Sequence, residues 1–265
     1  MPDTSLSYSQ NGHTNILSKE KIKKDDDATL KVNFYNLSIE VTRRCNMQCR
    51  HCMRGDAQNI DLQLDKIEKI LPQISNICDL TLTGGEPSMV PNIMRELLQL
   101  FKKYRVNVNN VYIVTNGKDI TPEFIMACLE WYWYCDDNEL SAVALSQDEF
   151  HDEIEQTNIE KLKALSFFND TDKAVDFRKS YVVDIGRAKK LNNQLKQQPI
   201  CTQPAAYIYE PLNELHITEG NITITVNGDI LTQADYEYTE TNNIKIGDTD
   251  DKLEDLFTYV VDDTY

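Results

Sequence analysis

The stretch Cys45-Asn46-Met47-Gln48-Cys49-Arg50-His51-Cys52 places three cysteines in a C-x3-C-x2-C arrangement. The other four cysteines stand apart from one another, at Cys78, Cys128, Cys135 and Cys201. Chance alone would give such a run in about 0.005 of sequences of this composition, so the spacing indicates a function. Three thiolates on one loop can hold either tetrahedral zinc or a cubane iron–sulfur cluster with one open iron. Zinc would need His51 as its fourth ligand, and the position of His51 beside Cys52 favours the cluster.

A second motif, Thr83-Gly84-Gly85-Glu86-Pro87, follows a segment in which Leu80 and Leu82 alternate with polar residues. The alternation predicts a strand, and the two glycines would let the backbone turn at its end and approach a ligand closely. Taken alone, the motif fits an ordinary turn from a strand to a helix equally well.

Together, the cysteine run and the GGEP turn resemble the radical S-adenosylmethionine (radical SAM) superfamily. In that superfamily a CxxxCxxC loop follows the first barrel strand, and a GGEP-type turn follows the second. The resemblance implies one 4Fe-4S cluster held by Cys45, Cys49 and Cys52. It also implies that S-adenosylmethionine binds the open iron and is cleaved by one electron to a 5'-deoxyadenosyl radical, which abstracts hydrogen from a substrate.

Segments of strand character recur at the period of βα units, beginning near residues 37, 79, 110, 141 and 180. Helical patterns lie between them, at 64–74, 93–101 and 121–135; the last has Thr121 as N-cap and Pro122 in its first turn. Right-handed crossovers then predict a parallel sheet. The fold class expected for residues 35–200 is α/β, a partial (β/α)6 TIM-like barrel, because the segment has no room for eight units.

Polar residues follow the expected strands at their carboxyl ends, where such barrels hold their chemistry. By the resemblance, these endings and one residue of the cysteine run form the cofactor site. The set is Gly84, Gly85, Glu86, Pro87, Asn116, Ser146, Asp148, Arg187 and His51.

The resemblance gives roles to several members of this set. The GGEP turn would meet the amino group of the cofactor through a backbone carbonyl and Glu86. Ser146 and Asp148 would hydrogen-bond its ribose or carboxylate, and the forked guanidinium of Arg187 would pair with the carboxylate. His51 stands where family members often place an aromatic residue near the adenine. Each polar ending taken alone also fits a loop or a helix cap, and no catalytic residue beyond the cofactor site can be named.

The two ends of the chain differ in character. Residues 1–34 are predicted to be a polar leader, and residues 201–265 a C-terminal extension with a hairpin or short meander around Asn227-Gly228 and an amphipathic helix over 251–261. The extension resembles the SPASM or twitch domain of radical SAM enzymes that modify peptides, but it lacks their cysteines. We therefore expect a lid without an auxiliary cluster.

The net charge and the hydropathy of the chain limit the classes of partner that we expect. The formal net charge of −16 makes nucleic acid an unfavourable partner. No apolar run approaches membrane-spanning length, so we expect no membrane association and a cytoplasmic protein.

The tail makes a peptide or protein side chain the preferred substrate. A small metabolite or nucleotide is an alternative substrate, and a non-catalytic iron–sulfur binding or sensing protein is an alternative function. A one-electron donor such as flavodoxin or ferredoxin could dock on either of two basic spots, Lys102, Lys103 and Arg105 or Lys189 and Lys190.

Overall fold

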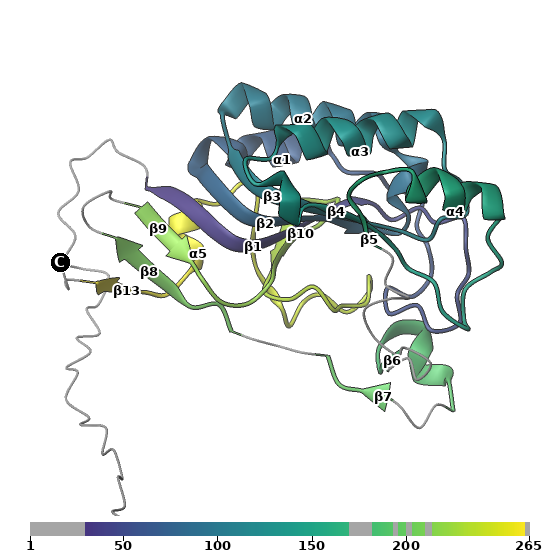
Figure 1. The fold of residues 1–265 in the computed structure, drawn as a ribbon. Helices are drawn as coiled ribbons and strands as arrows, with labels where there is room; N and C mark the ends of the chain where they lie inside the picture. Colours follow the sequence, from purple (N-terminus) through teal and green to yellow (C-terminus); the bar gives the residue numbers. More distant parts are fainter. Residues whose placement is uncertain (1–29, 170–181, 193–195, 200–202, 210–213, 263–265) are drawn as a thin grey trace, which may run out of the picture.

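An open sheet with helices on one face organises the molecule (Figure 1). The structure, a computed structural model, describes residues 30–169, 182–192, 196–199, 203–209 and 214–262. Five parallel strands pair in chain order: β1 (Lys31–Thr42), β2 (Ile74–Gly84), β3 (Asn107–Thr115), β4 (Ala142–Leu145) and β5 (Phe168–Asn169). These strands form no closed barrel within the described part of the chain, and the predicted partial barrel is confirmed.

The helices between the strands are α1 (Leu64–Ile70), α2 (Pro91–Tyr104), α3 (Pro122–Tyr134) and α4 (Gln156–Lys163). The start of α3 is as predicted: Pro122 occupies its first turn, and the Thr121 hydroxyl accepts a hydrogen bond from the Phe124 N–H at 3.2 Å. The pattern expected to be helical through residue 74 ends earlier. Pro72 disfavours a continuing α-helix, so a short 3₁₀ turn, η1 (Leu71–Gln73), leads directly into β2.

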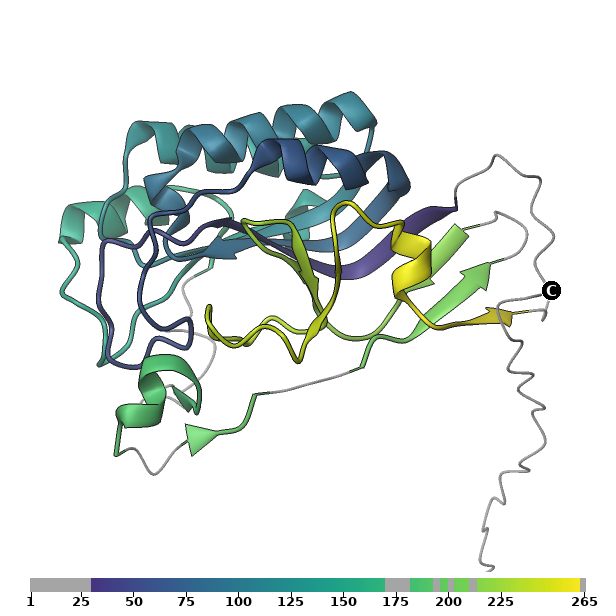
Figure 2. The ribbon, with the colours of Figure 1, turned by 180° about the vertical axis from the view of Figure 1, so that it is seen from behind.

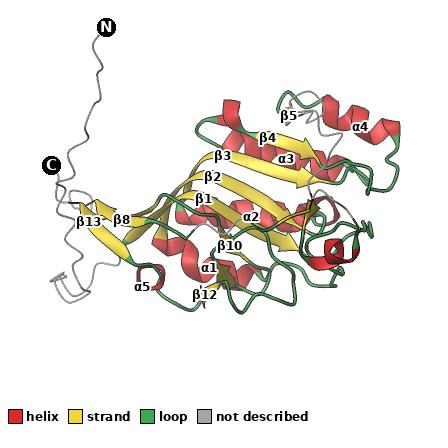
Figure 3. Cartoon of the chain, turned by 90° about the horizontal axis from the view of Figure 1, so that it is seen from below, coloured by secondary structure: helices red, strands yellow, loops and turns green. Residues whose placement is uncertain are grey.

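The two faces of the sheet differ in polarity. Leu37, Leu80 and Val111 are in register across β1, β2 and β3, and all three are fully buried in the core with the helices. The next residues along each strand point to the opposite, concave face, seen from below in Figure 3, and these are polar: Ser38, Thr81 and Tyr112. A closed barrel fills this space with branched apolar side chains, whereas here the space is open to polar groups.

The fifth strand lies elsewhere than the sequence suggested. The segment beginning near residue 180 was expected to complete the sheet, but its described part, β6 (Val182–Val183), pairs with β7 (Lys196–Gln197) in a separate two-stranded sheet. β5 takes its place beside β4. The physical reason is the turn that follows β6, η5 (Gly186–Lys190), where the Arg187 N–H donates to the Cys52 carbonyl at 3.0 Å and holds the segment against the cysteine loop.

The C-terminal residues extend the main sheet past β1. They form β8 (Ala206–Tyr209), β9 (Glu214–Ile217), β10 (Ile222–Ile224), β11 (Asp229–Leu231), β12 (Lys245–Asp248), α5 (Leu253–Leu256) and β13 (Tyr259–Asp262). β9 and β10 lie one after the other along β1, both parallel to it. The predicted hairpin at Asn227-Gly228 is confirmed as β10–β11.

The closing helix that the sequence predicted over residues 251–261 is much shorter in the structure. It is a single turn, α5, after which β13 pairs with β8. Phe257 explains the early end, because its ring packs edge-on against Phe34 of β1 with centroids 6.3 Å apart, and the extended chain beyond it continues with β-favouring residues. Figure 2 shows this tail at the edge of the sheet, and α5 lies next to η1, where the Leu253 N–H donates to Gln73 Oε1 at 2.9 Å.

The expected end of the polar leader at residue 34 also shifts, because β1 begins at Lys31; residues 1–29 and Cys201 lie outside the described part of the chain. No helix in the described ranges combines the length and the apolar composition needed to cross a bilayer.

Candidate active site

The three cysteines of the run surround a cavity of about 320 Å³ at the carboxyl ends of β1–β4. Every residue predicted to contact the cofactor lines this cavity except Arg187. The lining also contains His151, which the sequence did not single out as a site residue, and Val182 and Val183 of β6. The structure thus brings the polar strand endings together, as the barrel prediction required.

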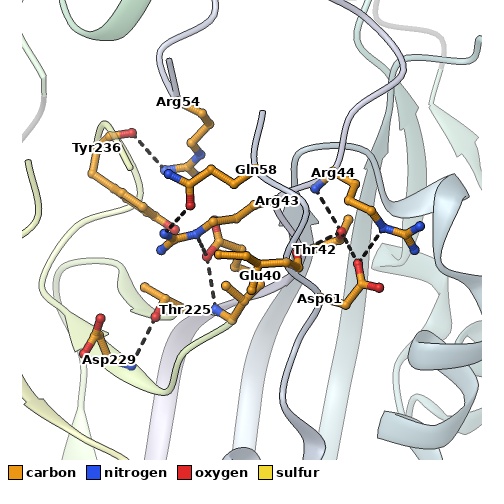
Figure 4. Close-up of polar contacts among 12 residues, drawn as sticks. Glu40, Thr42, Arg43, Arg44, Arg54, Gln58, Asp61, Thr225, Asp229 and Tyr236 are labelled. Carbon is orange, nitrogen blue, oxygen red and sulfur yellow. Dashed lines mark hydrogen bonds and ion pairs between the residues drawn. The ribbon is translucent and has the colours of Figure 1, made fainter. Parts of the chain in front are cut away.

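Short hydrogen bonds close the base of the cysteine loop (Figure 4). The Thr42 hydroxyl donates to Asp61 Oδ1 at 2.6 Å, and Arg44 Nε donates to the same oxygen at 2.8 Å. The Arg43 N–H donates to the Ile60 carbonyl at 2.8 Å. The loop therefore leaves β1 and returns at one point, which fixes the frame that carries the three thiols.

A buried carboxylate ties this frame to the tail. Glu40, with no exposed surface, accepts hydrogen bonds from Arg43 Nε and from the Val226 N–H, each at 3.0 Å (Figure 4). The other side of the Arg43 guanidinium donates to Gln58 Oε1 at 3.0 Å. Because a buried charge is costly unless it is paired, the Glu40–Arg43 pair fixes the position of both the loop and Val226, two residues after β10.

Two tyrosines of the tail cover arginines of the loop. The Arg54 guanidinium, nearly fully buried, lies 3.9 Å from the ring centroid of Tyr236, and Arg43 lies 4.5 Å from that of Tyr238. The Tyr238 N–H donates to the Arg54 carbonyl at 3.1 Å. Sequence analysis missed these contacts, because no local motif joins residues so far apart in the chain. The tail thus packs directly against the loop that bears the cysteines.

The thiols stand in an environment that suits a metal centre. Burial raises the pKa of the Cys49 thiol to about 11, and the neighbouring Cys45 and Cys52 add to the shift. Burial also raises the pKa of Cys45, while the Met47 N–H at 3.4 Å and Asn116 Nδ2 at 3.7 Å face its sulfur as donors. Three thiolates this close are unfavourable together without a cation among them, and hydrogen bonds to sulfur are typical of iron–sulfur sites, so the residues fit a cluster.

Gly84, the last residue of β2, and Gly85, which follows it, are required by the path of the backbone. Gly84 has φ +138°, and a Cβ atom there would lie 2.1 Å from the Thr42 carbonyl oxygen. A Cβ atom on Gly85 would lie 2.1 Å from the carbonyl oxygen of Arg44, the residue before Cys45. The turn passes directly against the start of the cysteine loop. The Glu86 N–H donates to the same Arg44 carbonyl oxygen at 2.8 Å. The close approach that the glycines allow is therefore to the loop, in addition to any ligand.

The Glu86 carboxylate is occupied within the protein. It is almost completely buried and accepts hydrogen bonds from the Ser88 N–H at 3.0 Å, the Thr115 hydroxyl at 2.6 Å and the Asn116 N–H at 2.7 Å. Burial raises the pKa of Glu86, and these donors oppose the shift. The carboxylate thus joins the ends of β2 and β3, and Gly84, Gly85 and Glu86 all line the cavity.

His51, Asp148 and His151 form one wall of the cavity. His151 Nδ1 lies 2.8 Å from Asp148 Oδ1, and His51 Nε2 lies 3.4 Å from Asp148 Oδ2. Burial lowers the pKa of His51. Its Nδ1 is buried and has no partner within the described residues, as expected of an atom that a bound ligand would satisfy.

Arg187 lies on the outer side of the cysteine loop. Its Nε donates to the Cys49 carbonyl at 3.0 Å, and its Nη1 lies 3.2 Å from Asp56 Oδ1. Gly186, at φ +57°, brings this segment so near that a Cβ atom would meet the Met53 carbonyl oxygen at 2.4 Å. In this arrangement Arg187 stabilises the cysteine loop, whereas the family resemblance implied that its guanidinium pairs with the carboxylate of the cofactor.

The remaining predicted residues are placed as follows. Cys128, within α3, and Cys135, its C-cap, are both buried in the core. Lys102 and Lys103 lie in the last turn of α2 and Arg105 is its C-cap, just before the start of β3 and away from the cysteines. Lys189 and Lys190 are in η5, next to the cysteine loop.

Comparison with known proteins agrees with this site. The sequence model of the Radical SAM superfamily matches residues 39–184, more than half of the chain. A GTP 3',8-cyclase of Rhizobium etli (strain CIAT 652) is 31% identical over 94 residues, which are 32% of this chain and 26% of the cyclase. The chain thus spans about a quarter of the length of that curated relative.

Two solved structures share the fold. Native anSMEcpe with bound AdoMet and Cp18Cys peptide superposes with a TM-score of 0.54 at 14% identity, over 85% of this chain and 80% of that one. SuiB of Streptococcus suis bound to precursor peptide SuiA gives a TM-score of 0.52 at 15% identity, over 89% of this chain and 66% of that one. At these identities the likeness concerns the fold alone.

Proposed function

This chain belongs to the radical SAM superfamily, and we propose that it is a member that modifies a side chain of a peptide or protein. The superfamily consists of enzymes that use a 4Fe-4S cluster and S-adenosylmethionine. When bound, these groups supply a radical that abstracts a hydrogen atom from the substrate. The observation that carries the proposal is the single cavity in which the three cysteines meet the turn after β2 and the ends of β3 and β4.

Different residues of the chain would have different roles at this cavity. Cys45, Cys49 and Cys52 would hold the cluster, and the backbone of Gly84 and Gly85 would face the amino group of S-adenosylmethionine. The cysteine loop is fixed by the contacts of Glu40, Thr42 and Asp61, so the thiols are positioned before any ligand arrives. The tail excludes water from the loop through Tyr236 and Tyr238, both nearly fully buried.

Charge in the cavity supports a peptide over a nucleotide. Within the described residues, the cavity lining contains one arginine or lysine, Arg54, whose guanidinium is stacked on Tyr236. A triphosphate needs several free cationic or N–H donors to replace its water. A neutral or cationic side chain needs none, and it is compatible with a protein of net charge −16.

The sequence likeness to a GTP 3',8-cyclase favours a second candidate, a nucleotide substrate. That likeness covers 32% of this chain, whereas the shared fold with the two peptide-bound structures covers 85% and 89% of it. The third candidate, an iron–sulfur protein without catalysis, is separated from both by cofactor turnover. One-electron reduction would come from a donor such as flavodoxin or ferredoxin, for which the exposed Lys190 beside the loop is the better placed of the two basic spots.

The test uses the full chain, reconstituted with iron and sulfide without oxygen and reduced with dithionite. We expect release of 5'-deoxyadenosine from S-adenosylmethionine, increased by peptides encoded near this gene and unchanged by GTP. The variant with Cys45, Cys49 and Cys52 all replaced by alanine is the negative control. No 5'-deoxyadenosine from the reconstituted protein would favour the non-catalytic candidate, and stimulation by GTP alone would favour the nucleotide.

A further inference from the structure

Helix α3 is apolar on the face that points away from the sheet as well as on the face that packs against it. Phe124 and Trp131 are fully buried in the core. On the opposite side, Met126 and Trp133 are 45% and 65% exposed, with the half-buried Leu129 between them. These three residues are spaced by three and four positions, so they form one stripe along the helix. A helix that is apolar all round is normally covered on all sides, so we expect the stripe to be covered.

Acidic residues flank the stripe. Residues 119–160, which include α3, contain five aspartates and seven glutamates and no lysine or arginine. Asp136, Asp137 and Glu139 are exposed just beyond the end of α3, where the helix dipole adds partial negative charge. Leu140, which follows them, is 67% exposed. A segment that covers the stripe should therefore be both apolar and cationic.

The basic side chains of the neighbouring helix α2 do not supply this cover, because they are engaged. The Arg95 guanidinium donates to Glu130 at 2.8 Å, and Lys103 pairs with Glu68 at 2.5 Å.

The same chain contains a segment of the matching chemistry. Residues 16–24, Ile-Leu-Ser-Lys-Glu-Lys-Ile-Lys-Lys, combine four lysines and one glutamate with Ile16, Leu17 and Ile22, and they lie outside the described part of the chain. A second copy of the protein would bring acidic residues against acidic residues, with a net charge of −16 on each copy. The charges therefore favour residues 16–24 over a second copy.

The segment is near enough in the chain to reach the stripe. β1 begins at Lys31, and its amino end lies at the same edge of the sheet as that of β3, two strands away (Figure 3). At that edge the Asp136 N–H donates to the Val108 carbonyl of β3 at 2.9 Å. Neighbouring strands are about 4.8 Å apart, so Asp136 lies about 15 Å across the sheet from β1. The chain between Lys24 and Lys31 can span up to about 23 Å.

We propose that residues 16–24 bind the stripe of Met126, Leu129 and Trp133, with their lysines beside the acidic residues that follow α3. The basic part of the predicted polar leader thus covers a helix of the same chain. This inference goes beyond the proposed function and does not depend on it, because neither cofactor nor substrate takes part in the contact.

Trp133 itself reports on the contact, because the other tryptophan, Trp131, is fully buried. The experiment measures the quenching of tryptophan fluorescence by acrylamide in the reconstituted full chain. The wild type is compared with a variant that has glutamate in place of four lysines, Lys19, Lys21, Lys23 and Lys24. We expect the quenching constant to rise about twofold in this variant, because release of a segment bound within the chain exposes one of the two tryptophans. Trp133→Phe should remove the difference between the two forms.

A reciprocal exchange of charge tests whether the acidic residues after α3 are the partner. Lysine in place of Asp136, Asp137 and Glu139, combined with the glutamate variant, should restore the quenching of the wild type. The matched control places lysine instead at three exposed acidic residues in and just before α4, Glu153, Glu155 and Glu160, and should not restore it.

Equal quenching in the wild type and the glutamate variant would overturn the inference, and so would restoration by the control set. Protection of Trp133 that increases with protein concentration would also overturn it, because the stripe would then bind a second copy. None of these outcomes bears on the proposed function, which is tested separately by the release of 5'-deoxyadenosine.

Discussion

Replacing Glu86 by glutamine should destabilise the fold through one backbone N–H group. In the wild-type protein, the two carboxylate oxygens accept from the Ser88 N–H and the Asn116 N–H separately, at 3.0 and 2.7 Å. An amide has only one oxygen, so one of these N–H groups must face the new NH2 group. The Thr115 hydroxyl can turn and accept, and it loses little.

The loss in the free energy of unfolding follows from the number of buried N–H groups that lose their acceptor. One buried N–H without an acceptor costs about 1–3 kcal/mol, so Glu86→Gln should lower the free energy of unfolding by about 2 kcal/mol. Glu86→Ala leaves both the Ser88 N–H and the Asn116 N–H without an acceptor and should cost about 4 kcal/mol.

Urea unfolding, followed by circular dichroism, measures both values. With a slope of about 2 kcal/mol per M, the midpoint should fall by about 1 M in Glu86→Gln and by about 2 M in Glu86→Ala. Glu96→Gln on the exposed side of α2 is the matched control and should change the free energy of unfolding by less than about 0.5 kcal/mol. Equal stability of Glu86→Gln and wild type would refute the reasoning, since it would mean that the carboxylate does not hold the ends of β2 and β3 together.

Four further results are expected. Replacing any one cysteine of the loop by alanine should reduce bound iron from about four per chain to near zero, whereas Cys78→Ala should leave it unchanged, as measured by iron assay after reconstitution. Gly85→Ala should also reduce bound iron, because its Cβ atom would displace the start of the cysteine loop, and iron retained by Gly85→Ala would contradict the argument. Tyr236→Leu should lower the free energy of unfolding by about 2 kcal/mol, because the buried Arg54 guanidinium loses the ring that covers it. Tyr35→Leu, at an exposed tyrosine, is the control in the same urea assay. Deleting residues 205–265 should remove cooperative unfolding, since both halves of β1 lose a paired strand; a truncated chain that unfolds cooperatively would show that the tail is a separable lid.

Local sequence signals correctly predicted the helix and strand ends that are determined by residues adjacent in the chain. Thr121 and Pro122 marked the start of α3 correctly because a cap and a first-turn proline act within one helical turn. The alternation around Leu80 and the following glycines located the end of β2, and with it one edge of the cavity.

Other features depend on partners that are distant in the chain, and local patterns could not reveal them. The strand character near residue 182 was visible, but its separation from the main sheet follows from the packing of Gly186 on the cysteine loop. The motif likewise identified Glu86 as a site residue without showing that Thr115 and Asn116 occupy its carboxylate. His151 had no signal except its nearness to Asp148 in the chain.

The pairing of β9 and β10 with β1 also has a consequence for how the protein is made. The strand that is synthesised first among those described must wait for residues 214–224 before one of its edges is covered. Contacts that span so much of the chain slow folding, and an uncovered strand edge can pair with another molecule in the meantime. The anchor that Val226 gives to Glu40 arrives at the same late stage. Delivery of iron and sulfur to the thiols is thus expected only once residues 214–226 have been synthesised, and overexpressed protein should gain most from chaperones that shield strand edges until then.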